Sequence, residues 1–213
     1  MTHWEIALFA YVSGALISLI PVILAVFTKV ALHAGGPAFD ESPNFSQEAR
    51  LRLSQNYERM RGTLGFWKNR AARFERIHIY CMLWIIILSI ATPALTQITG
   101  QYKDDPYAVW FLTIATLHIA LVTSVHKFLK VEVNFKAFRQ GESEFYDTYR
   151  RLLDSPKSFG ATEDEQLEAY FRDVALIRKQ VRNAETDTYA GLEELRQTAT
   201  RNQAGEPAAV RNS

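Results

Sequence analysis

The sequence predicts an all-α integral membrane protein with three transmembrane helices and a cytoplasmic helical bundle. Residues 6–28, 79–100 and 107–125 are uncharged apolar stretches. Each is close to the length of about 20 residues that a helix needs to cross the bilayer core. The remaining sequence is charged, and its apolar residues recur with helical periodicity. This pattern excludes most classes of soluble enzyme.

The first stretch, residues 6–28, predicts a retained membrane anchor rather than a cleaved signal peptide. Its apolar run is longer than the about 7–15 residues typical of a signal peptide, and no Lys or Arg precedes it. Lys29 closes this stretch, and Lys and Arg are frequent before the second stretch and after the third. Residues 101–106 hold one Lys and two Asp. The positive-inside rule therefore predicts an N-terminus outside and a C-terminus in the cytoplasm.

Apolar residues repeat at alternating spacings of three and four before the second stretch and after the third. One series runs from Leu53 to His78 and another from Phe128 to Leu152, so both membrane helices are expected to continue into the cytoplasm. A third series runs from Leu167 to Leu195. The three cytoplasmic helices are expected to pack together, because helices gain most of their stability from a buried apolar face.

Turn and capping residues set the boundaries between these elements. Residues 34–43 hold two Gly and two Pro, which is typical of a linker. Asn44 with Gln47, and Thr162 with Glu165, resemble capping boxes, and Pro156 ends the preceding helix. The expected organisation is an N-terminal transmembrane helix (1–33), a linker (34–43), a long-helix transmembrane hairpin (44–155), a C-terminal cytoplasmic helix (156–199) and a disordered tail (200–213).

Several motifs in this framework resemble those of the SLATT-type small helical membrane proteins. They are Asn56-Tyr57-Glu58-Arg59, Phe66-Trp67-Lys68 followed by Arg73 and His78, Thr92-Pro93, and Glu132-Val133-Asn134-Phe135-Lys136-Ala137-Phe138-Arg139 followed by Glu142. The resemblance covers residues 46–195. The chain differs in its additional N-terminal span and in Phe135, where the family commonly has Trp. The resemblance implies a protein of the bacterial inner membrane, of a kind proposed to form pores in bacterial conflict systems.

A stripe of small and hydroxyl residues on the third stretch is the first candidate site. Its members share one face of the helix and are Thr113, Thr116, Ala120, Thr123, Ser124 and Lys127. In an oligomer such a stripe can line a narrow aqueous path. It is equally typical of a face on which membrane helices pack, because small residues let backbones approach. Both interpretations remain open at this stage.

His118 is the titratable group at membrane depth, on the opposite side of the third stretch from this stripe. Ionisable residues at this depth are functional candidates. A neutral imidazole that bonds to Ser89, Thr92 or a carbonyl is one interpretation. A proton-sensing or ion-sensing role is the other.

Glu142 interrupts an apolar series and is expected to be paired, because burial of a lone carboxylate is costly. Arg139 on the same helix is the nearest partner, and Arg70 or Arg73 on the neighbouring helix are others. The pair is expected to be a structural ion pair or a switch.

The first stretch carries a ladder of small residues, Ala10, Gly14 and Ser18, that would let another helix approach closely. Its partner is expected to be another span of the same chain or a neighbouring subunit. Pro21 removes a backbone donor from this helix and is expected to bend it.

Enzyme chemistry has no support in the sequence, and neither a cofactor nor a metal site is expected. Glycine loops for phosphate and local nucleophile–histidine motifs are absent, and the five His are scattered over different segments. Cys81 has no second Cys to pair with. The net charge of +1 gives no general attraction to nucleic acid.

Two functions follow from these observations. The first is an oligomeric inner-membrane protein that forms a pore or perturbs the membrane under control of its cytoplasmic helices. The second is a non-catalytic accessory or scaffold subunit of a larger membrane complex. The expected partners are the lipid bilayer, further copies of the chain and a protein on the cytoplasmic side.

Overall fold

The computed structural model describes residues 2–32 and 39–204, without the side chains of residue 40 and residues 186–204. This part of the chain contains helices and no strand, as the sequence predicted. The elements are α1 (His3–Phe27), η1 (Phe39–Glu41), α2 (Gln47–Thr99), α3 (Pro106–Phe128), α4 (Val131–Asp154), η2 (Pro156–Ser158) and α5 (Glu163–Ala204). Three helical stretches, His3–Phe27, Gln47–Thr99 and Pro106–Asp154, are long and apolar enough to cross a membrane.

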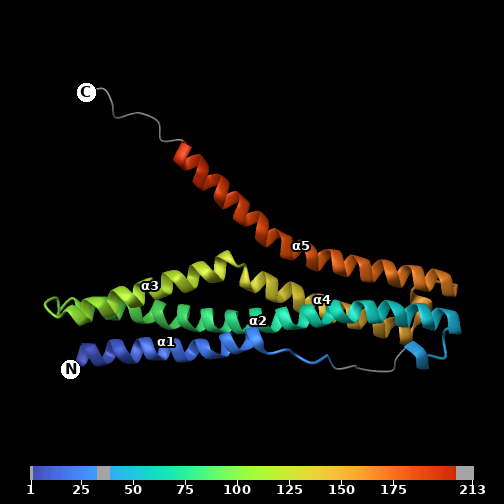
Figure 1. Ribbon diagram of the computed structural model, residues 1–213, viewed down its shortest axis with the longest axis horizontal. Helices are drawn as coiled ribbons and strands as arrows, with labels where there is room; N and C mark the ends of the chain where they lie inside the picture. The colour runs from blue at the N-terminus through green and yellow to red at the C-terminus, as the bar shows by residue number, and fades with distance from the viewer. Residues whose placement is uncertain (1, 33–38, 205–213) are drawn as a thin grey trace.

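One long helix, α2, connects the two parts of the molecule (Figure 1). Its 53 residues correspond to a length of about 80 Å. Residues 79–99 of α2 pack with α1 and α3 into an apolar three-helix part, which we call the apolar module. Residues 47–78 of α2 pack with η1, α4 and α5 into a second part, the polar bundle. The continuation of the second apolar stretch into a long polar helix is therefore confirmed.

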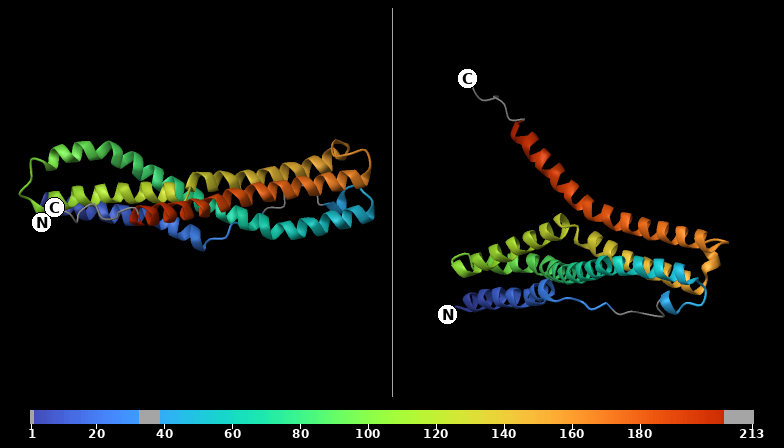
Figure 2. Two further views of the ribbon diagram at one scale, coloured as in Figure 1. Left: turned by 90° about the horizontal axis from the view of Figure 1, so that it is seen from above. Right: turned by 45° about the vertical axis from the view of Figure 1, so that its right-hand side comes forward.

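Within the apolar module, α2 and α3 form an antiparallel hairpin with α1 alongside (Figures 1 and 2). Asp105 caps α3, because its carboxylate accepts a hydrogen bond from the backbone N–H of Tyr107. The Trp4 ring lies 5.7 Å from the ring of Tyr102 and 5.9 Å from that of Phe111. The start of α1 thus lies at the same end of the molecule as the turn between α2 and α3.

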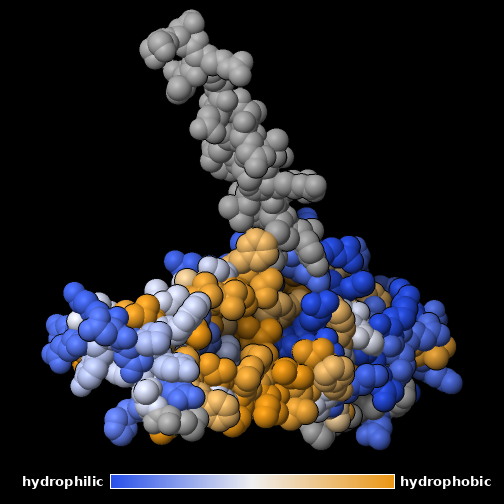
Figure 3. Space-filling view, turned by 60° about the vertical axis from the view of Figure 1, so that its left-hand side comes forward, coloured by the Kyte–Doolittle hydropathy of each residue, from blue (hydrophilic) through white to orange (hydrophobic). Residues whose placement is uncertain are grey.

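The outer surface of the apolar module consists largely of exposed aliphatic and aromatic side chains. Examples from the three helices are Phe9, Ile90 and Leu117, with exposed fractions of 71%, 74% and 68%. Figure 3 shows the apolar side chains gathered over one broad face, with polar side chains on either side. A surface of this kind matches a lipid environment better than water.

A break at Leu129 and Lys130 separates α3 from α4, whereas the sequence predicted one continuous extension. Lys130 adopts left-handed backbone angles, φ 42° and ψ 46°. The Asn134 side-chain amide donates to the Leu129 carbonyl oxygen over 2.9 Å, which satisfies a carbonyl at the break. The axis changes direction here, as the view in Figure 1 shows, although the apolar spacing continues across the break.

The polar bundle has a single continuous core of aliphatic and aromatic side chains from α2, α4 and α5. The largest fully buried members are Tyr170, Phe39, Phe138, Phe145, Leu53, Leu64, Leu152 and Leu167. These residues belong to the three series of apolar residues found in the sequence, with the addition of Phe39 from η1. Of the third series, Leu195 lies among the residues whose side chains the structure does not describe.

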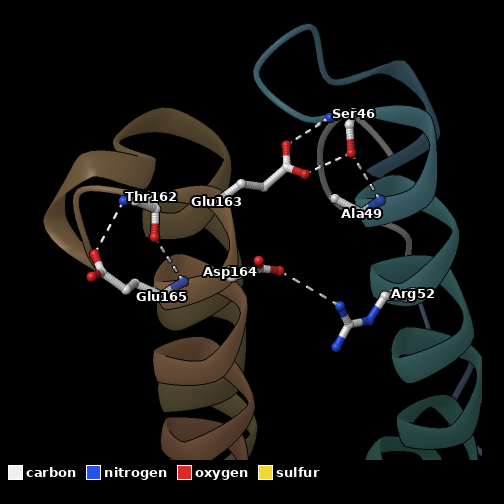
Figure 4. A network of polar contacts seen from close by, with 7 residues as sticks. All are labelled: Ser46, Ala49, Arg52, Thr162, Glu163, Asp164 and Glu165. Atoms are coloured by element: carbon white, nitrogen blue, oxygen red, sulfur yellow. Dashed lines mark hydrogen bonds and ion pairs between the residues drawn. The ribbon is translucent and has the colours of Figure 1, made fainter.

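The caps of α2 and α5 lie next to each other at the far end of the polar bundle (Figure 4). Thr162 and Glu165 form the predicted capping box: the Thr162 N–H donates to the Glu165 carboxylate and the Glu165 N–H to the Thr162 hydroxyl. The predicted cap of α2 was wrong. Ser46 caps this helix by accepting from the Ala49 N–H, whereas Asn44 donates to the Leu153 carbonyl.

Helix α5 extends to Ala204, beyond the predicted helix end at residue 199. Its C-terminal part runs away from α2 and α4 (Figure 1). Residues 205–213 of the predicted tail and residues 34–38 of the predicted linker lie outside the described residues. The C-terminal end of α4 at Asp154, directly before Ser155 and Pro156, agrees with the prediction.

Candidate functional site

His118 lies in the middle of the apolar module and contacts all three of its helices. Its Nδ1 lies 2.6 Å from the Tyr11 hydroxyl of α1, and its Nε2 lies 3.3 Å from the Tyr80 hydroxyl of α2. A neutral imidazole has one donor and one acceptor nitrogen, so one tyrosine donates to it and the other accepts from it. The three side chains form a chain of hydrogen bonds across the module.

Ser89 and Thr92, the partners that the sequence predicted for His118, are not the groups that bond to it in the structure. Ser89 is exposed, and the Thr92 hydroxyl donates to the Leu88 carbonyl of its own helix over 2.6 Å. The two tyrosines were missed because they are distant in sequence from His118. Their place on the inward face of each helix is visible only once the helices are paired.

A second hydrogen bond joins α1 to α2 next to His118. The Trp84 indole N–H donates to the Ser18 hydroxyl over 2.9 Å, and that hydroxyl donates to the Ala15 carbonyl over 2.8 Å. The Trp84 ring lies 4.9 Å from the His118 ring. Hydrogen bonds between helices in an apolar medium contribute about 1 kcal/mol each. Together these contacts fix α1 against the hairpin.

The small-residue ladder on α1 is split between two environments. Ser18 faces α2, whereas Ala10 and Gly14 are exposed, and a Cβ atom added to Gly14 would meet no atom within 4 Å. The face that α1 turns to its neighbours instead includes Trp4, Tyr11 and Ser18, spaced seven residues apart. Ala10 and Gly14 therefore remain open to a second chain or to lipid.

The stripe on α3 lies mostly on the outer surface of the apolar module. Thr113, Thr116, Ala120, Ser124 and Lys127 are exposed, and Thr123 is half-buried. The hydroxyl groups of Thr113 and Thr116 donate to the carbonyl oxygens of Val109 and Leu112 on their own helix. Apart from the half-buried Thr123, the stripe is therefore not covered by α1 or α2.

His78 and His126 form a pair that the sequence did not predict. Nδ1 of His78 lies 3.0 Å from Nε2 of His126, and the Phe135 ring of α4 stacks on His78 at 6.3 Å. Both histidines are equally far along the chain from Tyr102 in the turn, so antiparallel pairing of α2 and α3 brings them together. The described residues contain no group of three side chains that could hold a metal ion.

Glu142 lies in the polar bundle between two cations. Its Oε2 is 3.6 Å from Arg139 Nη1 and its Oε1 is 3.9 Å from Lys68 Nζ, and the Glu142 side chain is 11% exposed. Oε2 is buried without a hydrogen bond. Lys68 takes the place expected for Arg70 or Arg73: the Arg70 guanidinium lies over the Phe66 ring, and Arg73 donates to the Val26 carbonyl.

Comparison with protein-family models, with curated proteins and with solved structures finds no match for this chain.

Proposed function

We propose that this protein is a homo-oligomer of the bacterial inner membrane whose α3 stripes surround a path through the bilayer. The supporting observation is the outward position of Thr113, Thr116, Ala120, Ser124 and Lys127, on the side of α3 that α1 and α2 leave open. In a single chain these groups would face lipid. Several copies that turn their stripes toward a common axis would remove hydroxyl and ammonium groups from lipid.

The resemblance to SLATT-type proteins also supports a membrane-perturbing or pore-forming effector. The N-terminus lies outside in this proposal and the polar bundle is cytoplasmic. The position of the start of α1 beside the turn between α2 and α3 fits this orientation, because both would face the same side of the membrane. Lys29, Arg73 and Arg76 then lie on the inner side, as the positive-inside rule expects.

Control of the path by the polar bundle follows from the connections between the two parts. Helix α2 passes from the polar bundle into the apolar module without interruption, so a rotation of one end is transmitted to the other. The α3–α4 connection instead has the break at Lys130. Glu142, between Lys68 and Arg139, is a candidate switch, because loss of one cation would leave a buried carboxylate with one partner.

A scaffold subunit of a larger complex is the second candidate function. The hydrogen bonds of Thr113 and Thr116 within α3 favour it, because hydroxyls satisfied in this way need no water. The stripe would then be a dry packing face for another membrane helix. Co-purification of unrelated subunits in fixed stoichiometry would support this function over the pore.

Single cysteines in reconstituted protein distinguish these functions. The native Cys81 is buried and is first replaced by Ala. We expect Thr116→Cys and Ser124→Cys to react with a membrane-impermeant charged thiol reagent and to change dye release from liposomes when modified. Leu121→Cys is the control, because Leu121 is 60% exposed on a different face of α3. Absence of dye or ion leakage in every oligomeric state would contradict the pore.

A further inference from the structure

A groove of about 330 Å³ lies where the C-terminal end of α1 meets α2. Pro21, Leu24 and Ala25 of α1 form its apolar wall, and Ala72 and Arg76 of α2 form the opposite side. The groove shares no lining residue with the α3 stripe or with the hydrogen-bonded group of His118, Tyr11 and Tyr80. It combines an apolar surface with one cationic side chain.

Hydrogen bonds between α2 and the chain around the end of α1 fix the shape of this groove. Arg73 Nη2 donates to the Val26 carbonyl over 2.8 Å, and the Val30 N–H donates to Asn69 Oδ1 over 2.7 Å. The Asn69 amide in turn donates to the Gly65 carbonyl over 2.7 Å. Two hydrogen bonds therefore hold the end of α1 on α2, and the third orients the Asn69 side chain within α2, so the groove is preformed.

The groove lies at the boundary between the apolar module and the polar bundle. Leu24 in its wall is 57% exposed, and the neighbouring Ile20 and Ile23 of α1 are 48% and 49% exposed. Arg76 precedes the apolar stretch 79–100 by less than one turn of helix. In the proposed membrane orientation, Arg76 is at the depth of lipid phosphates and the apolar wall is at the depth of acyl chains.

Arg76 is available for an anion. The described residues give it no hydrogen bond and no acidic partner, whereas Arg73 is held by the Val26 carbonyl and Arg61 pairs with Glu58 at 3.5 Å. A guanidinium binds phosphate through two parallel hydrogen bonds. Basic pockets next to membrane helices on the cytoplasmic side recognise anionic lipid headgroups by this chemistry.

We propose that this groove binds an anionic phospholipid, with its phosphate on Arg76 and one acyl chain along Pro21, Leu24 and Ala25. The apolar wall selects a lipid over a free phosphate ion, and the positive charge selects an anionic lipid over a zwitterionic one. The inference rests on membrane insertion, as the proposed function does. It does not depend on a pore.

Native mass spectrometry of the full chain, after incubation with phosphatidylglycerol or phosphatidylcholine of the same acyl chains, tests the charge selection. The wild type is expected to retain phosphatidylglycerol preferentially. Arg76→Gln should reduce that preference about fivefold, the factor expected for the loss of one basic group near an anionic headgroup. Arg61→Gln removes the same charge farther along α2 and should leave the preference unchanged. An equal loss in both variants, or no loss in Arg76→Gln, would overturn the proposal.

A second variant tests the acyl-chain part without a change in charge. Ala25→Phe places a ring in the groove and is expected to lower phosphatidylglycerol retention, whereas Ala94→Phe on an exposed part of α2 should not. If the groove bound only the phosphate group, inorganic phosphate would compete fully with the lipid. Full competition would therefore contradict the proposed acyl-chain contact. Liposome leakage measured in parallel separates the two proposals, because a protein that forms no pore can still select the lipid.

Discussion

The Tyr11 hydroxyl lies 2.6 Å from Nδ1 of His118 and links α1 to α3 inside the apolar module. Tyr80 bonds to the other ring nitrogen, so the imidazole has a partner on each side. In lipid, no water is present to replace either tyrosine. The Tyr11 hydroxyl is therefore one of the groups that attach α1 to the hairpin, together with the Trp84–Ser18 hydrogen bond.

Replacement of Tyr11 by Phe is expected to lower the free energy of unfolding by about 1 kcal/mol, because it removes this hydrogen bond and keeps the aromatic packing. Titration of the protein with SDS in mixed micelles measures the change. Tyr107→Phe is the control, because Tyr107 is exposed at the start of α3. Equal stability of Tyr11→Phe and the wild type would show that the His118 contact does not hold α1.

The ion pair between Glu142 and Lys68 predicts an asymmetric response to mutation. Lys68→Met should destabilise the polar bundle by about 2 kcal/mol, because the buried Glu142 carboxylate then keeps only Arg139, whose side chain is 57% exposed and screened by solvent. The double variant Lys68→Met, Glu142→Leu should recover most of this loss, because no charge is left buried without a partner. Denaturant unfolding followed by circular dichroism measures both. A double variant as unstable as Lys68→Met would contradict the paired arrangement.

Gly141 of α4 lies against Val181 of α5 and Trp67 of α2. A Cβ atom at this position would overlap Val181 Cγ2 and lie 3.5 Å from the Trp67 ring. Gly141→Ala is therefore expected to destabilise the polar bundle by about 1–3 kcal/mol through overpacking. Thermal unfolding followed by circular dichroism measures the effect.

Gly62→Ala is the matched control for Gly141→Ala. Gly62 lies inside α2, and no atom lies within 4 Å of an added Cβ. Alanine should stabilise the helix there by about 1 kcal/mol, because glycine is the poorer helix former. Opposite signs for the two substitutions are expected. Stabilisation by both would mean that α4 and α5 are not in contact at Gly141.

The helices and the core of the polar bundle could be predicted from sequence because apolar spacing determines which face of each helix is buried. Leu53, Leu64 and Leu167 belong to predicted series and are all buried. The break at Lys130 could not be predicted in this way, since no Gly or Pro marks it. Left-handed angles at a lysine are set by tertiary packing and not by local preference.

The candidate polar groups were partly predictable for a related reason. Charge and depth identify His118 and Glu142, but their partners depend on helix register. Tyr11 and Tyr80 reach His118, and Lys68 reaches Glu142, from other helices. Sequence spacing defines a face within one helix, whereas a contact between helices requires their relative rotation and shift.

Tyr170 is fully buried in the polar bundle, and no described atom makes a hydrogen bond with its hydroxyl. Burial raises the pKa of this phenol above its usual value of 10.0. Tyr170→Phe is expected to stabilise the protein by about 1 kcal/mol, because a buried hydroxyl without a partner costs desolvation energy. Chemical denaturation measures the gain. A clear loss of stability would show that the hydroxyl has a partner, such as a buried water molecule.

The Glu163 carboxylate joins the caps of α2 and α5, because it accepts hydrogen bonds from the Ser46 hydroxyl over 2.6 Å and the Ser46 N–H over 2.8 Å (Figure 4). These bonds lower the pKa of Glu163 below its usual value of 4.5. A lowered folded-state pKa stabilises the protein above about pH 4.5, and this contribution disappears as the pH falls through the lowered pKa.

Glu163→Gln should therefore be less stable than the wild type at neutral pH, and the difference should shrink as the pH falls through the lowered pKa of Glu163. Thermal unfolding of both proteins across this range measures the difference in stability. The other carboxylates are the same in both proteins, so their titration does not contribute to this difference. Glu168→Gln on the exposed face of α5 is the control and should show a smaller difference at neutral pH. A constant difference between wild type and Glu163→Gln at every pH would mean that Ser46 binds the carboxyl group equally well in its protonated form.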